Sequence, residues 1–158
     1  MKKILIFLHG TIIMHQSGAN CSRDERVKQS ERRDTSVLDY ENYIPIGDAV
    51  KKVREWQKQG YQIAYLSSHE DAKDVEKDRT VLERYDFPKA EIYYRKNGES
   101  YAQVAEKIMP DILIEDDCES IGGAEEMTIT HIKREIKKNI KSIFVKEFEG
   151  VDNLPDRF

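Results

Sequence analysis

The chain has 158 residues, 39% apolar and 35% charged, which is typical of one water-soluble globular domain with a single core. Its 26 basic and 30 acidic residues give a net charge of −4, so we expect neither nucleic acid nor a membrane as partner. The first apolar stretch is too short to span a bilayer and no small-residue cleavage site follows it, so we expect a cytoplasmic protein. Cys21 and Cys118 are isolated, which predicts free thiols.

Three apolar runs each end in polar residues, which is the pattern of buried strands that carry functional side chains at their ends. They span residues 2–12 (KKILIFLHGTI), 61–68 (YQIAYLSS) and 111–117 (DILIEDD). Because the carboxyl ends of parallel strands meet at one edge of a sheet, we expect the three polar ends to form the functional site.

The stretch from residue 14 to residue 43 follows the first strand and differs from the rest of the chain. It is rich in polar and charged residues, and its apolar residues show little periodicity. Such an insert at the active edge of a sheet is typical of a lid or flap, although an ordinary surface loop has the same composition. We therefore expect one domain over residues 1–158 with 14–43 as an insert, and both interpretations of the insert stay open.

After the insert, helical and extended patterns alternate to the end of the chain. Apolar spacing predicts helices over residues 46–59, 70–85, 99–109 and 131–139. Short extended runs predict two further strands, at residues 92–94 and 142–146. This alternation predicts an α/β fold of the three-layer Rossmann-like kind, with a central parallel sheet and helices on both faces.

The order of the polar motifs resembles the haloacid dehalogenase (HAD) superfamily, whose motifs are Asp-x-Asp-Gly-Thr/Val, a Ser/Thr, a Lys and an acidic pair. The matching positions are Gly10, Thr11 and Ile12 for the first motif, Ser67 for the second, Lys96 for the third, and Asp116 with Asp117 for the fourth. The resemblance covers nearly the whole chain outside the insert. It implies a HAD-like fold, chemistry of the phosphatase kind and a magnesium ion.

The first motif departs from the family at its two most diagnostic positions. Phe7 and His9 stand where the family carries its nucleophilic aspartate and its acid/base aspartate. A phenyl ring forms no acyl-phosphate, so aspartyl-phosphate chemistry at this position is excluded. His9 could act as a general acid/base near neutral pH, or it could be a neutral, hydrogen-bonded side chain that fills a gap. His69, beside the two serines, could also reach the site.

Five residues at the predicted sheet edge are candidates for binding a phosphate group. Backbone N–H groups that follow a strand favour an anion, and Gly10 and Thr11 can supply them. Ser67 and Ser68 can add hydroxyl donors, and Lys96 can add a positive charge. The alternatives are that Ser-Ser-x-Glu caps a helix and that Lys96 is an ordinary solvated lysine.

Three consecutive carboxylates, Glu115, Asp116 and Asp117, end the third apolar run. They repel one another unless a cation lies among them, so Asp116 and Asp117 predict a magnesium site. The alternative is that Glu115 packs to one side and one aspartate caps the region of Ser120. HAD relatives use a carboxylate at the position of Phe7 as a further ligand, so a site without it would be weaker.

These residues are compatible with three functions. In the first, the domain binds a phosphorylated small molecule at the strand ends without aspartyl-phosphate chemistry. In the second, it is a metal-dependent phosphohydrolase, in which His9 and Asp116 are catalytic and a metal-bound hydroxide replaces the protein nucleophile. In the third, it is a non-catalytic scaffold for another protein. Loss of both aspartates with retention of the other motif positions is what the binding function predicts.

Overall fold

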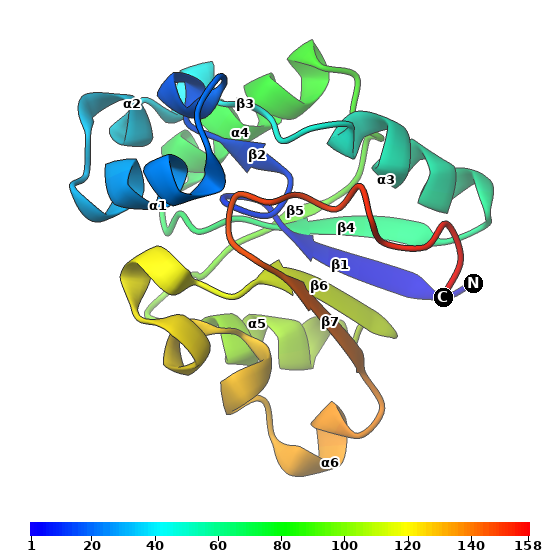
Figure 1. The fold of residues 1–158 in the computed structure, drawn as a ribbon. Helices are drawn as coiled ribbons and strands as arrows, with labels where there is room; N and C mark the ends of the chain where they lie inside the picture. Colours follow the sequence, from blue (N-terminus) through cyan, green and yellow to red (C-terminus); the bar gives the residue numbers. More distant parts are fainter.

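A five-stranded parallel sheet forms the centre of the computed structural model, which describes residues 1–158. The strands are β1 (Lys3–Phe7), β4 (Gln62–Leu66), β5 (Ile92–Tyr93), β6 (Ile112–Asp116) and β7 (Lys141–Val145). Their spatial order is β5-β4-β1-β6-β7, so β1 lies in the middle and every pairing is parallel (Figure 1). All the strands predicted from apolar runs are present.

Helices cover both faces of the sheet, because alternate residues of β1 are apolar and buried on opposite faces. The four helices outside the insert are α3 (Ala49–Lys58), α4 (Ala72–Arg84), α5 (Tyr101–Ile108) and α6 (Arg134–Lys137). Ile4 and Ile6 pack on one face in a cluster with Trp56 of α3, whereas Leu5 packs on the other face in a cluster with Ala105 of α5. Successive side chains of a strand point to opposite faces, so this alternation builds two core layers. The predicted three-layer fold is confirmed.

The predicted helix at residues 131–139 is shorter than expected. Between β6 and β7 lie three short 3-10 helices and then α6; the 3-10 helices are η3 (Glu119–Ile121), η4 (Gly123–Glu126) and η5 (Ile129–His131). Lys133 with Lys137, and Arg134 with Lys138, are like-charged pairs four residues apart, and such pairs destabilise a helix. None of the helices in the chain combines the length and the apolar character that crossing a membrane requires.

The insert folds over the carboxyl edge of the sheet (Figure 1). At its base, β2 (Ile13–Met14) pairs antiparallel with β3 (Ile44–Pro45). Between them lie η1 (Gln16–Gly18), α1 (Arg23–Glu31), α2 (Thr35–Leu38) and η2 (Tyr40–Asn42). The helix α1 packs against η3, and η2 packs against α4, so the insert contacts both sides of the sheet edge. Only Val27 and Gln29 of α1 are buried, which explains the weak apolar periodicity in the sequence.

Truncating Leu5 to alanine tests the central layer. Leu5 is fully buried in β1, so Leu5→Ala should lower the free energy of unfolding by about 2–5 kcal/mol, measured by urea denaturation. Phe144→Ala is the control, because Phe144 lies on the edge strand β7 with 62% of its surface exposed. Its effect should stay within about 0.5 kcal/mol, and equal losses in the two variants would contradict this packing.

Candidate functional site

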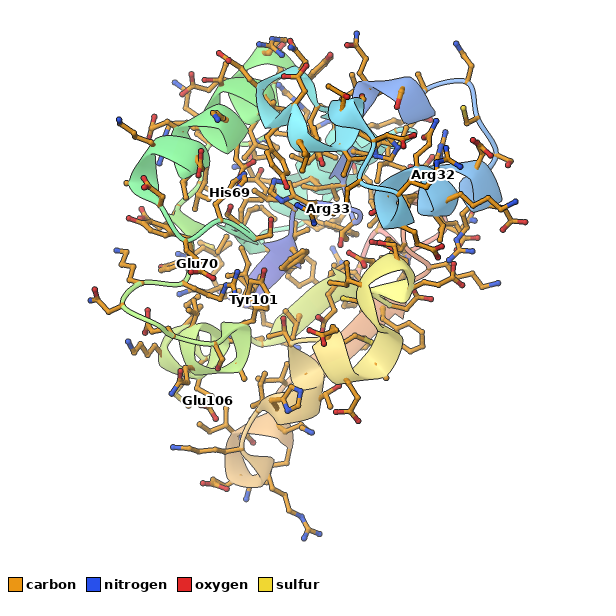
Figure 2. All side chains as sticks on the ribbon, turned by 90° about the vertical axis from the view of Figure 1, so that its left-hand side faces the viewer. Arg32, Arg33, His69, Glu70, Tyr101 and Glu106 are labelled. Carbon is orange, nitrogen blue, oxygen red and sulfur yellow. The ribbon has the colours of Figure 1, made fainter.

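A cavity of about 180 Å³ lies at the carboxyl edge of the sheet, and we call it the edge cavity. Its lining residues are Phe7, His9, Gly10, Ser68 and Glu115 from the sheet edge, Ser30, Arg33, Val37, Tyr40 and Tyr43 from the insert, and Tyr101, Cys118, Ser120, Ile121, Glu126, Thr128, Glu147 and Phe148 from later segments. Figure 2 looks onto this edge, with Arg33 of the insert above Tyr101 of α5. The ends of β1 and β4 therefore meet the insert around one cavity.

His9 lies between Ser68 and Asp78 and hydrogen-bonds to both. Its Nδ1 contacts the Ser68 hydroxyl, and its Nε2 lies 2.6 Å from Asp78 Oδ1. Burial opposes ionisation of Asp78, but the neighbouring His9 and the hydrogen bonds from His9 and Ser67 outweigh it and lower the pKa of Asp78. An ionised carboxylate only accepts hydrogen bonds, so His9 Nε2 carries the proton that is donated to Asp78, and in the tautomer with this single ring proton Nδ1 accepts from Ser68. We call these three residues the Ser68-His9-Asp78 relay.

The imidazole of His69 packs beside this relay. Its Nε2 is buried, has no hydrogen-bond partner and lies 3.8 Å from Asp78 Oδ1. Burial, and then the neighbouring His9, lower the pKa of His69, so the ring is neutral at pH 7. Tyr40 covers the ring edge-to-face, with 4.4 Å between ring centroids. His69 therefore lies behind His9 and does not line the edge cavity.

The three carboxylates at the end of β6 have separate hydrogen-bond partners. Glu115 accepts from two backbone N–H groups, and so does Asp117. Asp116 accepts from the Thr11 hydroxyl at 2.9 Å and from a backbone N–H. Burial is the main cause that raises the pKa of both Glu115 and Asp116. Local hydrogen bonds thus satisfy these side chains.

Local hydrogen-bond donors occupy the carboxylates of Asp116 and Asp117, and no third carboxylate comes from position 7 to join them. Magnesium requires several oxygen ligands that converge on one point. The one group of three potential metal ligands that converge in this chain lies elsewhere, and Phe7 offers no oxygen. Magnesium at these aspartates stays a prediction.

Glu147, which follows β7, forms the acidic side of the edge cavity with Asp116 behind it. Its two carboxylate oxygens accept from the Ser120 backbone N–H at 2.7 Å and the Ser120 hydroxyl at 2.9 Å. Burial, followed by the charge of Asp116, raises the pKa of Glu147 to about 7. Gly10 has a φ of +86°, and a Cβ there would lie 3.1 Å from both Asp116 Oδ2 and Glu147 Cγ. Glycine is therefore required at this close approach.

The backbone N–H groups of Gly10 and Thr11 are already used within the turn after β1. The Gly10 N–H donates to the carbonyl of Ile13 at 2.9 Å, and the Thr11 N–H donates to that of Leu8 at 3.2 Å. Gly10 lines the edge cavity, whereas Thr11 is fully buried. Neither amide is free for an anion in this conformation.

The two serines after β4 have different environments. Ser67 is fully buried and donates its hydroxyl to Asp78 Oδ2 at 2.5 Å, whereas Ser68 lines the edge cavity. Neither serine caps α4, because Asp71 is the N-cap residue and accepts from a backbone N–H of the first turn. The helix-cap interpretation of Ser-Ser-x-Glu is therefore wrong.

Lys96 lies outside the edge cavity. Its amino group sits 4.9 Å from the centroid of the Tyr94 ring, and it lines a different hollow. The preceding residue, Arg95, approaches the site instead: its Nη2 donates to the Ser68 carbonyl at 2.9 Å, and its guanidinium lies 4.2 Å from the centroid of the Tyr101 ring. The positive charge nearest Ser68 from this loop therefore comes from Arg95.

Sequence reasoning missed Asp78, Arg33 and Glu147. Asp78 left one signal, because it falls at helical spacing between Val75 and Leu82 on the buried face of α4. An acidic residue inside an apolar stripe needs a partner, since a buried unpaired charge is costly. Arg33 lies in the weakly patterned insert, and no sequence signal placed it beside the sheet edge.

No protein-family model and no curated protein matches the chain in sequence. Two chains of similar structure come from the Pnkp1/Rnl/Hen1 complex and the Pnkp1/Rnl/Hen1 RNA repair complex, with TM-scores of 0.59 and 0.57 and identities of 13% and 14%. Each match covers 92% of this chain but only 46% and 42% of the other, so this chain spans less than half their length. A HAD hydrolase, family IA, variant 3, from Entamoeba histolytica HM-1:IMSS has a TM-score of 0.50 and 10% identity, covering 92% of this chain and 84% of the other. The fold is HAD-like. At these identities the similarity is evidence of the fold alone.

Replacing Glu147 by glutamine tests the acidic side of the cavity. A carboxyl group whose pKa rises on folding supports the folded state at low pH, and this contribution is lost between pH 4.5 and about 7. Glutamine never ionises and keeps an acceptor for Ser120. The stability of Glu147→Gln relative to wild type should therefore increase by up to about 3 kcal/mol across this range. Urea denaturation at a series of pH values measures it.

The control for this experiment is Glu149→Gln, because Glu149 is exposed and only two residues away. It should show no such gain with rising pH. A Glu147→Gln curve parallel to wild type at all pH values would contradict the raised pKa of Glu147.

Proposed function

We propose that the edge cavity binds a phosphorylated small molecule without aspartyl-phosphate chemistry. The observation that carries the proposal is an unpaired cation opposite a hydroxyl in one cavity. Arg32 pairs with Glu25 and Asp34, whereas Arg33 makes no ion pair within the chain and lines the cavity with Ser68. A guanidinium suits phosphate because its parallel N–H groups match two phosphate oxygens.

The rest of the lining indicates what the remainder of the ligand is like. Phe7 and Tyr101 meet edge-to-face with 5.2 Å between centroids, and the rings of Tyr40 and Tyr43 pack at a tilt with 5.1 Å between centroids. Aromatic walls of this kind favour an apolar or aromatic body. Glu147 lies on the acidic side and repels an anion when ionised, so the phosphate group belongs at the Arg33 side.

A second candidate function is ester hydrolysis through the Ser68-His9-Asp78 relay, and the hydrogen bonds of His9 favour it. The Ser68 oxygen bonds to the phosphorus or carbonyl carbon of an ester while its proton moves to His9 Nδ1. Asp78 stabilises the imidazolium that forms. The leaving alcohol takes that proton, and water then hydrolyses the serine ester and regenerates the hydroxyl.

Binding is tested with inorganic phosphate, glycerol phosphate and para-nitrophenyl phosphate in a thermal-shift titration. We expect saturable stabilisation by the aromatic ester in particular. Arg33→Ala should weaken it about 10- to 100-fold, because a hydrogen bond to a charged group contributes about 1.5–3 kcal/mol. Ser68→Ala should weaken it less, because the Ser68 hydroxyl must exchange its hydrogen bond to His9 Nδ1 for one to the phosphate. Isothermal titration calorimetry gives the dissociation constants.

Lys96→Ala is the matched control for Arg33→Ala, since it also removes one exposed positive charge but lies outside the cavity. Its affinity for the ester should equal that of wild type. If Lys96→Ala weakens binding and Arg33→Ala does not, the ligand lies elsewhere and the proposal fails. Turnover of the same esters, with and without magnesium, reports on the phosphohydrolase prediction for Asp116 and Asp117.

The hydrolytic candidate is tested with a fluorophosphonate probe, which labels activated serines. Wild type should be labelled at one peptide that contains Ser68, and His9→Ala should be labelled at least about tenfold more slowly, because a general base contributes about 10²- to 10⁴-fold. Peptide mass spectrometry identifies the labelled residue. Labelling that is equally fast in wild type and His9→Ala would exclude the relay as a catalytic unit.

A further inference from the structure

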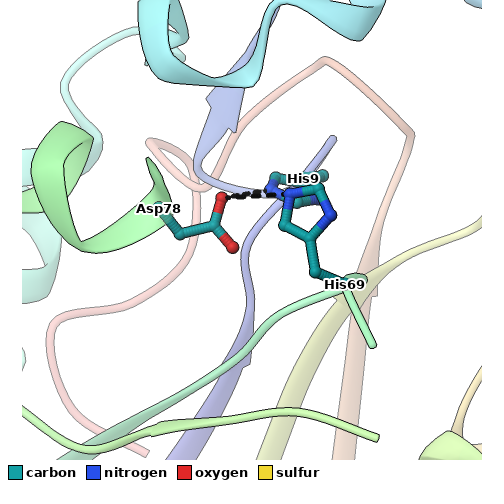
Figure 3. Close-up of side chains that lie close together, drawn as sticks. All are labelled: His9, His69 and Asp78. Carbon is teal, nitrogen blue, oxygen red and sulfur yellow. Dashed lines mark hydrogen bonds and ion pairs between the residues drawn. The ribbon is translucent and has the colours of Figure 1, made fainter. Parts of the chain in front are cut away.

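We propose that His9, His69 and Asp78 form a binding site for one zinc-type divalent metal ion, directly behind the edge cavity. The three side chains come from the loop after β1, the loop after β4 and the helix α4. Figure 3 shows the two imidazoles and the carboxylate converging. One ligand atom from each, the two imidazole nitrogens and a carboxylate oxygen, lies within 4.8 Å of the others.

The spacing of these atoms suits a tetrahedral ion. His9 Nε2 lies 2.6 Å from Asp78 Oδ1, and His69 Nε2 lies 3.8 Å from the same oxygen. Ligands bound to zinc at about 2.0–2.1 Å in tetrahedral geometry are about 3.3 Å apart. The first pair therefore has to separate by about 0.7 Å and the second to approach by about 0.5 Å when the ion binds.

The strongest argument comes from the unused nitrogen of His69. Its side chain is only 10% exposed, its Nε2 has no hydrogen-bond partner, and this atom faces the fully buried carboxylate of Asp78. Buried polar atoms in native proteins are nearly always satisfied, so an exception needs a reason. A metal ion bound to Nε2 supplies the missing partner.

The donor set also selects the class of metal. Two imidazoles and one carboxylate suit zinc, cobalt or nickel, whereas magnesium prefers oxygen ligands alone. Three protein ligands leave a fourth position for water, as in zinc sites with an open position. This site is therefore distinct from the magnesium predicted at Asp116 and Asp117.

The neighbouring serines hold two of the ligands in place. Ser67 donates to Asp78 Oδ2, which leaves Oδ1 for the metal, and Ser68 contacts His9 Nδ1, which leaves Nε2 for the metal. The second nitrogen of a metal-binding histidine commonly hydrogen-bonds to a neighbouring group. Such a group, here called an outer partner, does not touch the metal but orients the ligand that does. Both serines thus fit the role of outer partners.

The site is tested with purified wild type freed of metal by a chelator and titrated with zinc chloride by calorimetry. We expect one zinc ion per chain and a higher thermal midpoint that the chelator reverses. His69→Ala should weaken zinc binding by more than the roughly 10- to 100-fold that loss of an outer partner costs, and Ser68→Ala by about tenfold. Cobalt-loaded wild type should show the visible spectrum of four-coordinate cobalt with histidine nitrogen ligands.

His131→Ala is the matched control, because His131 is exposed and is not one of the three converging ligands. It should bind zinc like wild type. Wild-type protein that takes up no zinc, or His69→Ala that binds it as tightly as wild type, would overturn the proposal. The zinc proposal and the ester-binding proposal can fail independently. Arg33→Ala should still bind zinc. His69 does not line the edge cavity, so His69→Ala should still bind the ester.

Discussion

The buried carboxylate of Asp78 is the group on which the arrangement of the site depends. Asp78 belongs to α4 and is fully buried. Its carboxylate stays ionised because His9 and Ser67 each donate a hydrogen bond to it. These two partners follow β1 and β4, so one side chain joins the ends of two strands to the helix that covers them. Removing either partner would leave a buried charge incompletely satisfied, which costs more than an ordinary lost hydrogen bond. The hydrogen bonds of Asp78 therefore hold the ends of β1 and β4 against α4, and the same residues are candidates for catalysis.

The phenyl ring at position 7 is consistent with the electrostatics around it. Asp116 and Glu147 lie next to the loop after β1, and burial is the main cause that raises the pKa of both. The charge of Asp117 adds to the effect on Asp116, and the charge of Asp116 adds to the effect on Glu147. A carboxylate at position 7 would add a further negative charge beside them and would require a cation to offset it. Phe7 instead packs against Tyr101 and adds no charge. The phenyl ring thus fits a sheet edge whose acidic groups are held by hydrogen bonds.

The fold could be predicted because periodicity is set by local chemistry, whereas the site depends on packing that periodicity does not encode. Apolar runs located all five strands of the main sheet, and the meeting of parallel strand ends located His9 and Ser68 correctly at one edge. The sequence predicted Lys96 as the cation at the site, whereas Arg95 is the residue that contacts Ser68. Side chains of adjacent residues in an extended segment point in different directions, so a shift of one residue decides which cation approaches Ser68. Arg33 depends on how the insert folds back, and that contact is between distant parts of the chain.

The two nitrogens of His9 make serine chemistry and metal binding alternative states of one side chain. Proton transfer from Ser68 requires a lone pair on Nδ1, which is present when Nε2 carries the proton and donates it to Asp78. A metal on Nε2 displaces that proton, so neutral His9 then carries its proton on Nδ1 and can only donate to Ser68. The serine loses its base in the metal-bound form and becomes an acceptor. Metal occupancy behind the cavity would therefore decide whether the hydroxyl facing the ligand is a nucleophile or a hydrogen-bond partner.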